Sequence, residues 1–103
     1  MNVRNIGDPH EWFDVLVTGE TSQAAVMDLE PGGGESGHKG NEHAASEQVL
    51  FVVDGEVDAE VGDERRTLKA GDVVIVPRGV AHRFSNRGTR TARTLNVYGP
   101  PAY

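Results

Sequence analysis

The sequence predicts an all-β protein whose strands form a barrel or a sandwich. Short apolar segments recur along the chain, and glycine, proline or aspartate separates most of them from the next. No stretch longer than about one turn has the apolar spacing of an amphipathic helix. Eight strands are expected, at residues 12–17, 22–29, 48–53, 56–61, 65–68, 73–76, 81–85 and 91–98.

Alternation within these segments indicates which side chains face inward. In 56–61, Val57, Ala59 and Val61 alternate with three acidic residues, which is the pattern of a half-buried strand. Residues 91–98 place Ala92, Thr94, Asn96 and Tyr98 on one face, opposite Arg93, Leu95 and Val97. Residues 48–53 are apolar on both faces, so we expect them to pack between the barrel interior and a neighbouring layer.

Turn residues separate the strands. Thr18 and Gly19 end the first segment, and Pro31 with three following glycines ends the second. Asp54 and Gly55 form a hairpin signal after 48–53. Further turns are expected at 62–63, 69–72 and 77–79, and Asp72 and Asn86 are interpreted as turn-forming residues.

The length of 103 residues is that of a single domain with one modest core. We expect an irregular N-terminal arm at 1–11, a barrel at 12–98 and an extended tail at 99–103. Only 37% of the residues are hydrophobic. A homodimer is therefore expected, because an interface would bury additional apolar surface.

Composition excludes several classes of protein. The chain has no cysteine, which excludes disulfides and thiolate metal sites. The first residues lack the apolar core of a signal peptide, and no apolar run approaches the roughly 20 residues of a membrane helix. We therefore expect a cytoplasmic protein with no membrane partner.

Charge is unevenly distributed along the chain. The net charge is −6, which disfavours nucleic acid as a partner, although beyond Glu64 the only acid is Asp72. The basic residues of this half alternate with apolar ones, so we expect them to pair across the sheet with acids from the first half. A basic tail that binds nucleic acid is the alternative. His10 is expected at the surface.

Two stretches carry candidate metal ligands. From Asn41 the spacing is N-x-H-x4-Q-x6-G, and it ends at Gly55. From Gly71 it is G-x5-P-x-G-x2-H-x3-N, and it ends at Asn86. Residues i and i+2 of a strand share a face, so Asn41 and His43 can converge on one point. With Gln48 and His82 they would supply two imidazoles and two amide oxygens to one ion.

These two stretches resemble the motifs of the cupin superfamily. The second matches at Gly71, Pro77, Gly79, His82 and Asn86, and the first matches in spacing. The resemblance implies a double-stranded β-helix, a jelly-roll type of barrel, in one domain. It also implies a divalent ion held by Asn41, His43, Gln48 and His82. Zinc, nickel, manganese and iron are all compatible with these ligands.

The first motif departs from the family in two ligands. Asn41 stands where cupins carry a histidine, and Gln48 stands where they carry a glutamate. All four ligands would then be neutral, which weakens ion binding but leaves a strong Lewis acid for an anionic substrate. Some cupins that act on uronate sugars are similar in using glutamine here. Isomerase, lyase-like and dioxygenase reactions all stay open.

Several alternatives remain at this point. The histidines could be interior residues bonded to Gln48 and Asn41 in a metal-free barrel that only binds a small ligand. His38 is a second candidate for the position given to Asn41. Met27, Leu50, Phe84, Asn96 and Tyr98 are expected to line the pocket, with ordinary core packing as the alternative for them. Arg78 and Arg83 either meet an acidic substrate or form surface ion pairs. A helper subunit of a partner enzyme is a third functional class.

Overall fold

The structure is a computed structural model that describes residues 1–33 and 45–103. Every predicted strand is present, and its ends agree with the prediction to within about one residue. No helix occurs among the described residues, and hence none that is long and apolar enough to cross a membrane. The strands are β1 (Phe13–Thr18), β2 (Gln23–Leu29), β3 (Glu47–Asp54), β4 (Glu56–Val61), β5 (Glu64–Lys69), β6 (Val73–Val76), β7 (His82–Ser85) and β8 (Ala92–Gly99).

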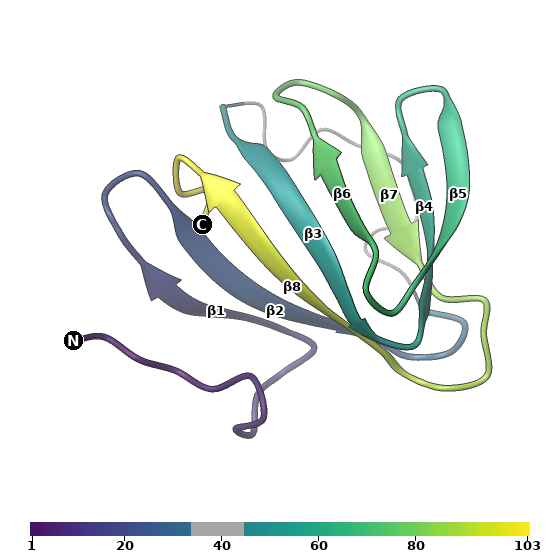
Figure 1. The fold of residues 1–103 in the computed structure, drawn as a ribbon, viewed down its shortest axis with the longest axis horizontal. Coiled ribbons are helices and arrows are strands. Elements are labelled where there is room, and N and C mark those ends of the chain that lie inside the picture. The colour runs from purple at the N-terminus through teal and green to yellow at the C-terminus, as the bar shows by residue number, and fades with distance from the viewer. Residues whose placement is uncertain (34–44) are drawn as a thin grey trace.

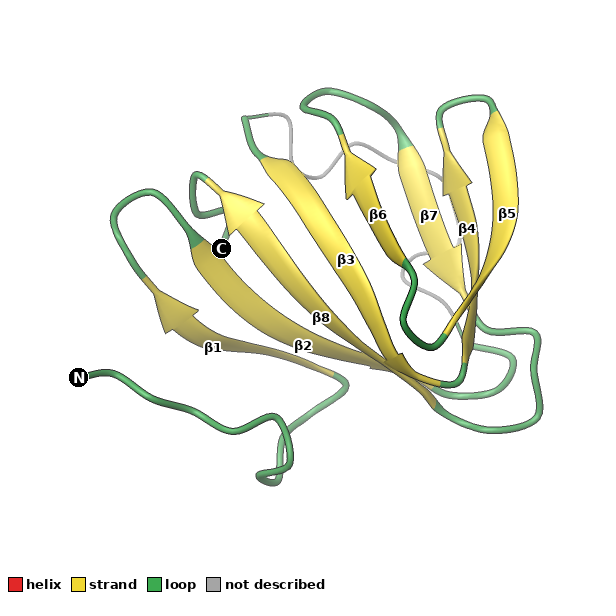
Figure 2. Ribbon diagram, in the orientation of Figure 1, coloured by secondary structure: helices red, strands yellow, loops and turns green. Residues whose placement is uncertain are grey.

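The strands form two antiparallel sheets that face each other (Figures 1 and 2). The larger sheet has the order β1-β2-β8-β3-β6, and the smaller has the order β5-β4-β7. The chain passes between sheets at the β3–β4, β5–β6, β6–β7 and β7–β8 connections. This arrangement is the double-stranded β-helix that the sequence predicts.

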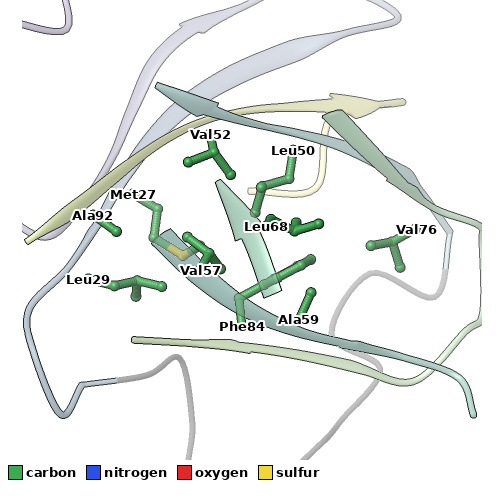
Figure 3. Close-up of a cluster of buried hydrophobic side chains, with 10 residues drawn as sticks. All are labelled: Met27, Leu29, Leu50, Val52, Val57, Ala59, Leu68, Val76, Phe84 and Ala92. Atoms are coloured by element: carbon green, nitrogen blue, oxygen red, sulfur yellow. The ribbon is translucent and has the colours of Figure 1, made fainter. Parts of the chain in front are cut away.

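The core lies between the two sheets (Figure 3). Because side chains of a strand alternate between its faces, the strands from β2 to β8 direct residues of one face into this space. Full burial of one such aliphatic side chain contributes about 1.5–3 kcal/mol. In the described part of the chain the buried cluster consists of Met27, Leu29, Leu50, Val52, Val57, Ala59, Leu68, Val76, Phe84 and Ala92.

The outer face of β3 differs from the prediction. Residues 48–53 were expected to be covered on both faces, yet Phe51 on the outer face is 37% exposed. Leu50 and Val52 on the inner face are fully buried. The expectation is wrong for the outer face, because no described segment forms a further layer over β3 and its edge neighbour β6.

Acidic residues from the first half of the chain form ion pairs with basic residues from the second half, as predicted. Glu60 on β4 accepts from Arg65 at 3.1 Å and from Arg83 at 2.8 Å, and both arginines lie on neighbouring strands. Asp54 pairs with Arg90 at 2.9 Å. Exposed pairs of this kind stabilise a fold by about 0–1 kcal/mol each. Their main effect is to neutralise charge on the outer surface.

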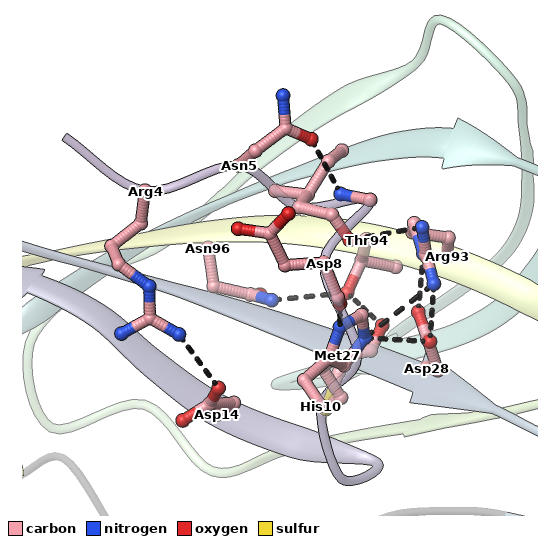
Figure 4. A network of polar contacts seen from close by, with 12 residues as sticks. Arg4, Asn5, Asp8, His10, Asp14, Met27, Asp28, Arg93, Thr94 and Asn96 are labelled. Carbon is pink, nitrogen blue, oxygen red and sulfur yellow. Dashed lines mark hydrogen bonds and ion pairs between the residues drawn. The ribbon is translucent and has the colours of Figure 1, made fainter.

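The N-terminal arm is bound to the outside of the larger sheet (Figure 4). His10 Nε2 lies 2.9 Å from Asp28 Oδ2, and Arg93 donates to both oxygens of the same carboxylate at 2.9 Å. Arg93 also donates to the Ile6 carbonyl at 3.1 Å. The His10 side chain is only 4% exposed. The prediction of a surface residue was therefore wrong, because an ion pair on β2 and β8 draws the imidazole inward.

Candidate functional site

Gln48 and His82 enter the barrel interior at the same end. Gln48 is the second residue of β3 and His82 the first of β7, and both strands begin at the upper end of Figure 1. Gln48 shares the inner face of β3 with the core residue Leu50, and His82 shares that of β7 with Phe84. Their exposed fractions are 0% and 5%. Both polar side chains therefore lie between the sheets, as the alternation of side chains along a strand predicts.

A buried chain of hydrogen bonds orients the Gln48 amide. Gln48 Nε2 donates to Asn96 Oδ1 at 2.9 Å, and Asn96 Nδ2 donates to Thr94 Oγ1 at 3.0 Å. The Thr94 hydroxyl donates in turn to the Met27 carbonyl at 2.9 Å. Gln48, Asn96 and Thr94 are all fully buried. Because each member of the chain donates to the next, the amide nitrogen of Gln48 is used inside the protein.

The amide oxygen of Gln48 is left without such a partner. Gln48 Oε1 is buried and has no hydrogen bond within the described part of the chain. An unsatisfied buried acceptor costs about 1–3 kcal/mol, so native proteins rarely retain one without a reason. A divalent cation would compensate the cost, because amide oxygens are ordinary ligands for such ions. This oxygen therefore fits a metal site.

His82 has a fixed tautomer that also fits a ligand. Its Nδ1 lies 2.9 Å from the Val80 carbonyl, which accepts a hydrogen bond but cannot donate one. In its neutral form the ring therefore carries its proton on Nδ1 and its lone pair on Nε2. Phe84 holds the ring from one side, at 5.9 Å between centroids. A backbone carbonyl that fixes the second nitrogen is the usual arrangement behind a metal-binding histidine.

The remaining predicted ligands lie outside the described residues. Asn41 and His43 belong to residues 34–44, as does His38, the alternative to Asn41. In the described ranges, no group of three or more histidine, cysteine, aspartate or glutamate residues is arranged to hold an ion. What those ranges contribute to the predicted ligand set is one imidazole and one amide oxygen, and no carboxylate.

The side chains predicted to line the pocket are buried, with different roles. Met27, Leu50 and Phe84 belong to the hydrophobic core. Asn96 is the second member of the hydrogen-bonded chain, and the fully buried Tyr98 ring packs edge-on against Tyr103 at 5.2 Å. In the pairing of β8 with β3, Tyr98 lies opposite Gln48 and Asn96 lies opposite Leu50.

Thr94 was not singled out from the sequence. The alternation along 91–98 could have identified it, because Thr94 shares a face of β8 with Asn96 and is therefore directed into the same interior. A threonine at a strand position is usually interpreted as a β-branched packing residue. Only the hydrogen bond from Asn96 to its hydroxyl identifies it as part of the site.

Arg83 belongs to the outer surface rather than to the barrel mouth. It lies with Arg65 and Glu60 along a shallow cleft of about 310 Å³ on the outer side of the smaller sheet. Its ion pair to Glu60 supports the surface-pairing alternative for this residue. Arg78 is exposed in the loop between β6 and β7.

A double-stranded β-helix that buries a histidine and an amide at the same end of its interior defines a small cupin-type barrel. Comparison with known proteins agrees: the family model described as Cupin domain matches residues 25–98. The chain therefore belongs to the cupin family.

Individual proteins show the extent of the similarity. Protein SchB of Streptomyces halstedii is 31% identical over 102 residues, which cover 98% of this chain and 72% of that protein. Tetracenomycin polyketide synthase protein TcmJ of Streptomyces glaucescens is 30% identical over 76 residues, or 74% of this chain. These residues span 49% of TcmJ, about half of its length.

A solved structure shows the same fold. The protein TT1209 from Thermus thermophilus superposes with a TM-score of 0.82 at 24% identity, over 97% of this chain and 98% of that one. At this identity the similarity concerns the fold alone. The function must be inferred from the residues that this chain places inside the barrel.

Proposed function

We propose that this cupin binds one divalent metal ion in the barrel and acts there on a small molecule through a carboxylate or enolate oxygen. The observation that carries the proposal is Gln48 Oε1, which is buried and without a hydrogen-bond partner in the described ranges. The chain through Asn96 and Thr94 keeps this end of the amide available for a cation. His82 supplies the second ligand from the opposite sheet.

Asn41 and His43 would complete the set, as the motif spacing predicts. Zinc, nickel, manganese or iron would act as a Lewis acid on the substrate oxygen, and neutral ligands leave its charge available for an anion. Sugar acids and polyketides both present such oxygens, and the name of the relative TcmJ refers to a polyketide synthase. Isomerisation, lyase-like elimination and dioxygenation are the reaction classes that such a site serves.

A second candidate function is a barrel that binds a small ligand without metal and without turnover. It is supported by the chemistry of the described interior groups, since Gln48, Asn96, Thr94 and His82 bring no carboxylate to balance a cation. In this alternative, the Gln48 oxygen would accept a hydrogen bond from the ligand. The two functions differ in whether a metal stabilises the protein.

Metal binding is tested on protein purified without chelator and without nickel affinity chromatography. We expect bound divalent metal in the parent, and an increase in melting temperature when the preferred ion is added. Gln48→Leu and His82→Ala should each lower metal affinity by about 100-fold or more, because each removes a ligand. Gln48→Glu should bind the ion more tightly, since it restores a charged ligand.

Two matched variants serve as controls. Gln23→Leu removes another buried glutamine, whose amide binds the backbone of Ala102 and Tyr103. His10→Ala removes a buried histidine on the outer side of the sheet. Both should keep the metal content of the parent. A parent that neither carries metal nor responds to any of the four ions would contradict the proposal and favour the metal-free binder.

A further inference from the structure

The shallow cleft on the outer side of the smaller sheet has a regular construction. Its volume is about 310 Å³. Strand register places two rows of side chains across β5, β4 and β7 there, because paired residues of neighbouring strands point to the same face. The first row is Arg65, Glu60 and Arg83, and the second is Thr67, Asp58 and Ser85. The acidic strand β4 thus lies between two strands that carry cations and hydroxyl groups.

Positive charge exceeds negative charge in this cleft. The charged residues that line it are Arg65, Arg66, Arg83, Arg87, Asp58 and Glu60, and we refer to the cleft as the arginine cleft. Four cations less two anions leave an excess of two positive charges, although the chain as a whole has a net charge of −6. Four of the ten basic residues of an acidic chain therefore meet at one place on its surface.

One carboxylate serves two of these arginines. Glu60 contacts Arg65 through Oε1 at 3.1 Å and Arg83 through Oε2 at 2.8 Å. Two guanidinium groups therefore share a single negative charge, and each has further N–H donors, because a guanidinium carries five. An anion that entered the arginine cleft would find both groups already held in place by Glu60.

The opposite part of the arginine cleft supplies donors that no protein group uses. The guanidinium groups of Arg66 and Arg87 form no ion pair with an acidic side chain of the described ranges, and the Ser85 hydroxyl has no hydrogen bond there. Asp58 does not occupy these donors, since its oxygens accept from the Thr67 hydroxyl at 3.1 Å and from the backbone N–H of Arg87 at 3.0 Å.

We propose that the arginine cleft binds a phosphate group, free or as the monoester of a small molecule, at a site separate from the barrel. A phosphate monoester carries about 1.5–2 negative charges at pH 7 and has three acceptor oxygens, so it matches both the excess charge and the free donors. A carboxylate would cancel only one of the two charges. Arginine suits this ligand, because its planar guanidinium pairs bidentately with phosphate oxygens.

Two charge-neutralising substitutions should change phosphate affinity in opposite directions. Arg87→Gln removes a free guanidinium and should weaken binding by about 10-fold. Glu60→Gln removes the carboxylate that competes for Arg65 and Arg83, so it should tighten binding by about 3–10-fold. A cleft that served only surface ion pairing would not show this second effect.

Two controls change the net charge equally at exposed positions elsewhere. Arg78→Gln lies in the loop between β6 and β7, and Glu20→Gln lies in the turn between β1 and β2. Both should bind within about twofold of the parent, because exposed charges beyond about 10 Å are largely screened. Circular dichroism verifies that all four variants are folded.

Isothermal titration calorimetry of the full chain measures binding of inorganic phosphate and of glycerol 3-phosphate at constant ionic strength. The ratio of the two affinities distinguishes a free phosphate from a phosphate ester. Amide shifts in ¹⁵N NMR spectra locate the ligand, and we expect them at Thr67, Ser85 and Arg87. The barrel metal takes no part in this binding, so the proposed function and the phosphate site fail independently.

Three results would each overturn the phosphate site. The first is a parent that binds neither probe at about 10 mM, which is weaker than the roughly millimolar affinity expected for several charge-assisted contacts. The second is a set of amide shifts confined to the surroundings of Gln48, since the anion would then bind inside the barrel. The third is Arg87→Gln and Glu60→Gln variants that bind as Arg78→Gln and Glu20→Gln do.

Discussion

Gln48 shows how a single side chain acquires a role from its neighbours. Its strand position determines that it faces the interior, but the two ends of an amide are nearly equal in shape. The bond to Asn96 Oδ1 selects the nitrogen as the inner donor and leaves the oxygen for another partner. Replacement by leucine would keep the volume and remove that acceptor, which is why the metal test uses this change.

Gly55 illustrates a residue that is required by its surroundings. It has φ of +82°, and a Cβ there would lie 2.9 Å from Ala92 Cα and 3.0 Å from the Thr91 carbonyl oxygen. We expect Gly55→Ala to lower the free energy of unfolding by about 2–4 kcal/mol, from backbone strain and steric overlap together. Urea denaturation measures the difference.

Gly71 provides the matched control for this prediction. Its φ is +94°, but a Cβ there would have no heavy atom within 4 Å. Gly71→Ala should therefore cost only the strain of the positive φ, about 1 kcal/mol. Equal losses for the two alanine variants would show that close contact with β8 does not decide the choice of glycine at residue 55.

At the scale of the element, β8 carries both the core and the polar chain. Its inner face begins with Ala92, which belongs to the core, and continues with Thr94 and Asn96, which hold Gln48 in place. The strand lies between β2 and β3 in the larger sheet. Hydrogen bonds on both of its edges keep it rigid, so small polar side chains on it have well-defined positions.

Thr94→Val tests whether the chain supports the site. The change keeps the shape but removes the hydroxyl that accepts from Asn96 and donates to Met27. We expect metal affinity to fall by about 10–100-fold, because the amide of Gln48 would lose its fixed orientation. The stability loss should be about 1–3 kcal/mol, for polar groups left unpaired.

Thr67→Val is the control. It removes an exposed hydroxyl of the smaller sheet, which donates to Asp58 on the neighbouring strand of that sheet. Metal titration monitored by melting temperature separates the two effects for each variant. Unchanged metal affinity in Thr94→Val, together with reduced stability, would show that Thr94 has a structural role only.

At the scale of the whole molecule, His10 connects the N-terminal arm to the sheet. Its Nδ1 lies 2.7 Å from the Asp8 carbonyl and its Nε2 lies 2.9 Å from Asp28 Oδ2. Both partners are acceptors, so the doubly protonated imidazolium satisfies both. The bond to the Asp8 carbonyl and the bond to Asp28 raise the pKa of His10, while burial and Arg93 oppose the increase.

This pKa has a defined consequence for stability. Because the folded-state pKa of His10 lies above its ordinary value of about 6.5, the contribution is fully present below that pH. It is lost as pH rises through the folded-state pKa. We expect His10→Ala to lower the free energy of unfolding by about 1 kcal/mol more at pH near 5.5 than at pH near 8.5.

Urea denaturation of parent and variant at both pH values measures this difference. Asp28 affects a separate range: burial acts to raise its pKa, but hydrogen bonds from Arg93 and His10 prevail and lower it. Its contribution is present above about pH 4 and is lost only as pH falls through the lowered value. A His10→Ala effect that is the same at both pH values would show that protonation of His10 does not stabilise the arm.

Much of the fold follows from the sequence alone, because it depends on local patterns. Alternation along 56–61 and 91–98 and the turn signals at Gly55 and Gly71 concern residues that are close in the chain. The same is true of the motif that places His82 at the start of a strand. In a sheet, alternate residues of a strand point to opposite faces. This is why Gln48 and Asn96 were correctly placed inside.

Only the tertiary structure decided features that depend on contacts between distant residues. His10 is buried because Asp28 and Arg93, 18 and 83 residues away, meet beside it. The free end of the Gln48 amide depends on Asn96, 48 residues away. Phe51 is partly exposed because no described segment covers that part of the sheet. An apolar or polar residue has the same chemistry in any sequence, but whether its groups are paired, buried or left open depends on which neighbours the fold provides.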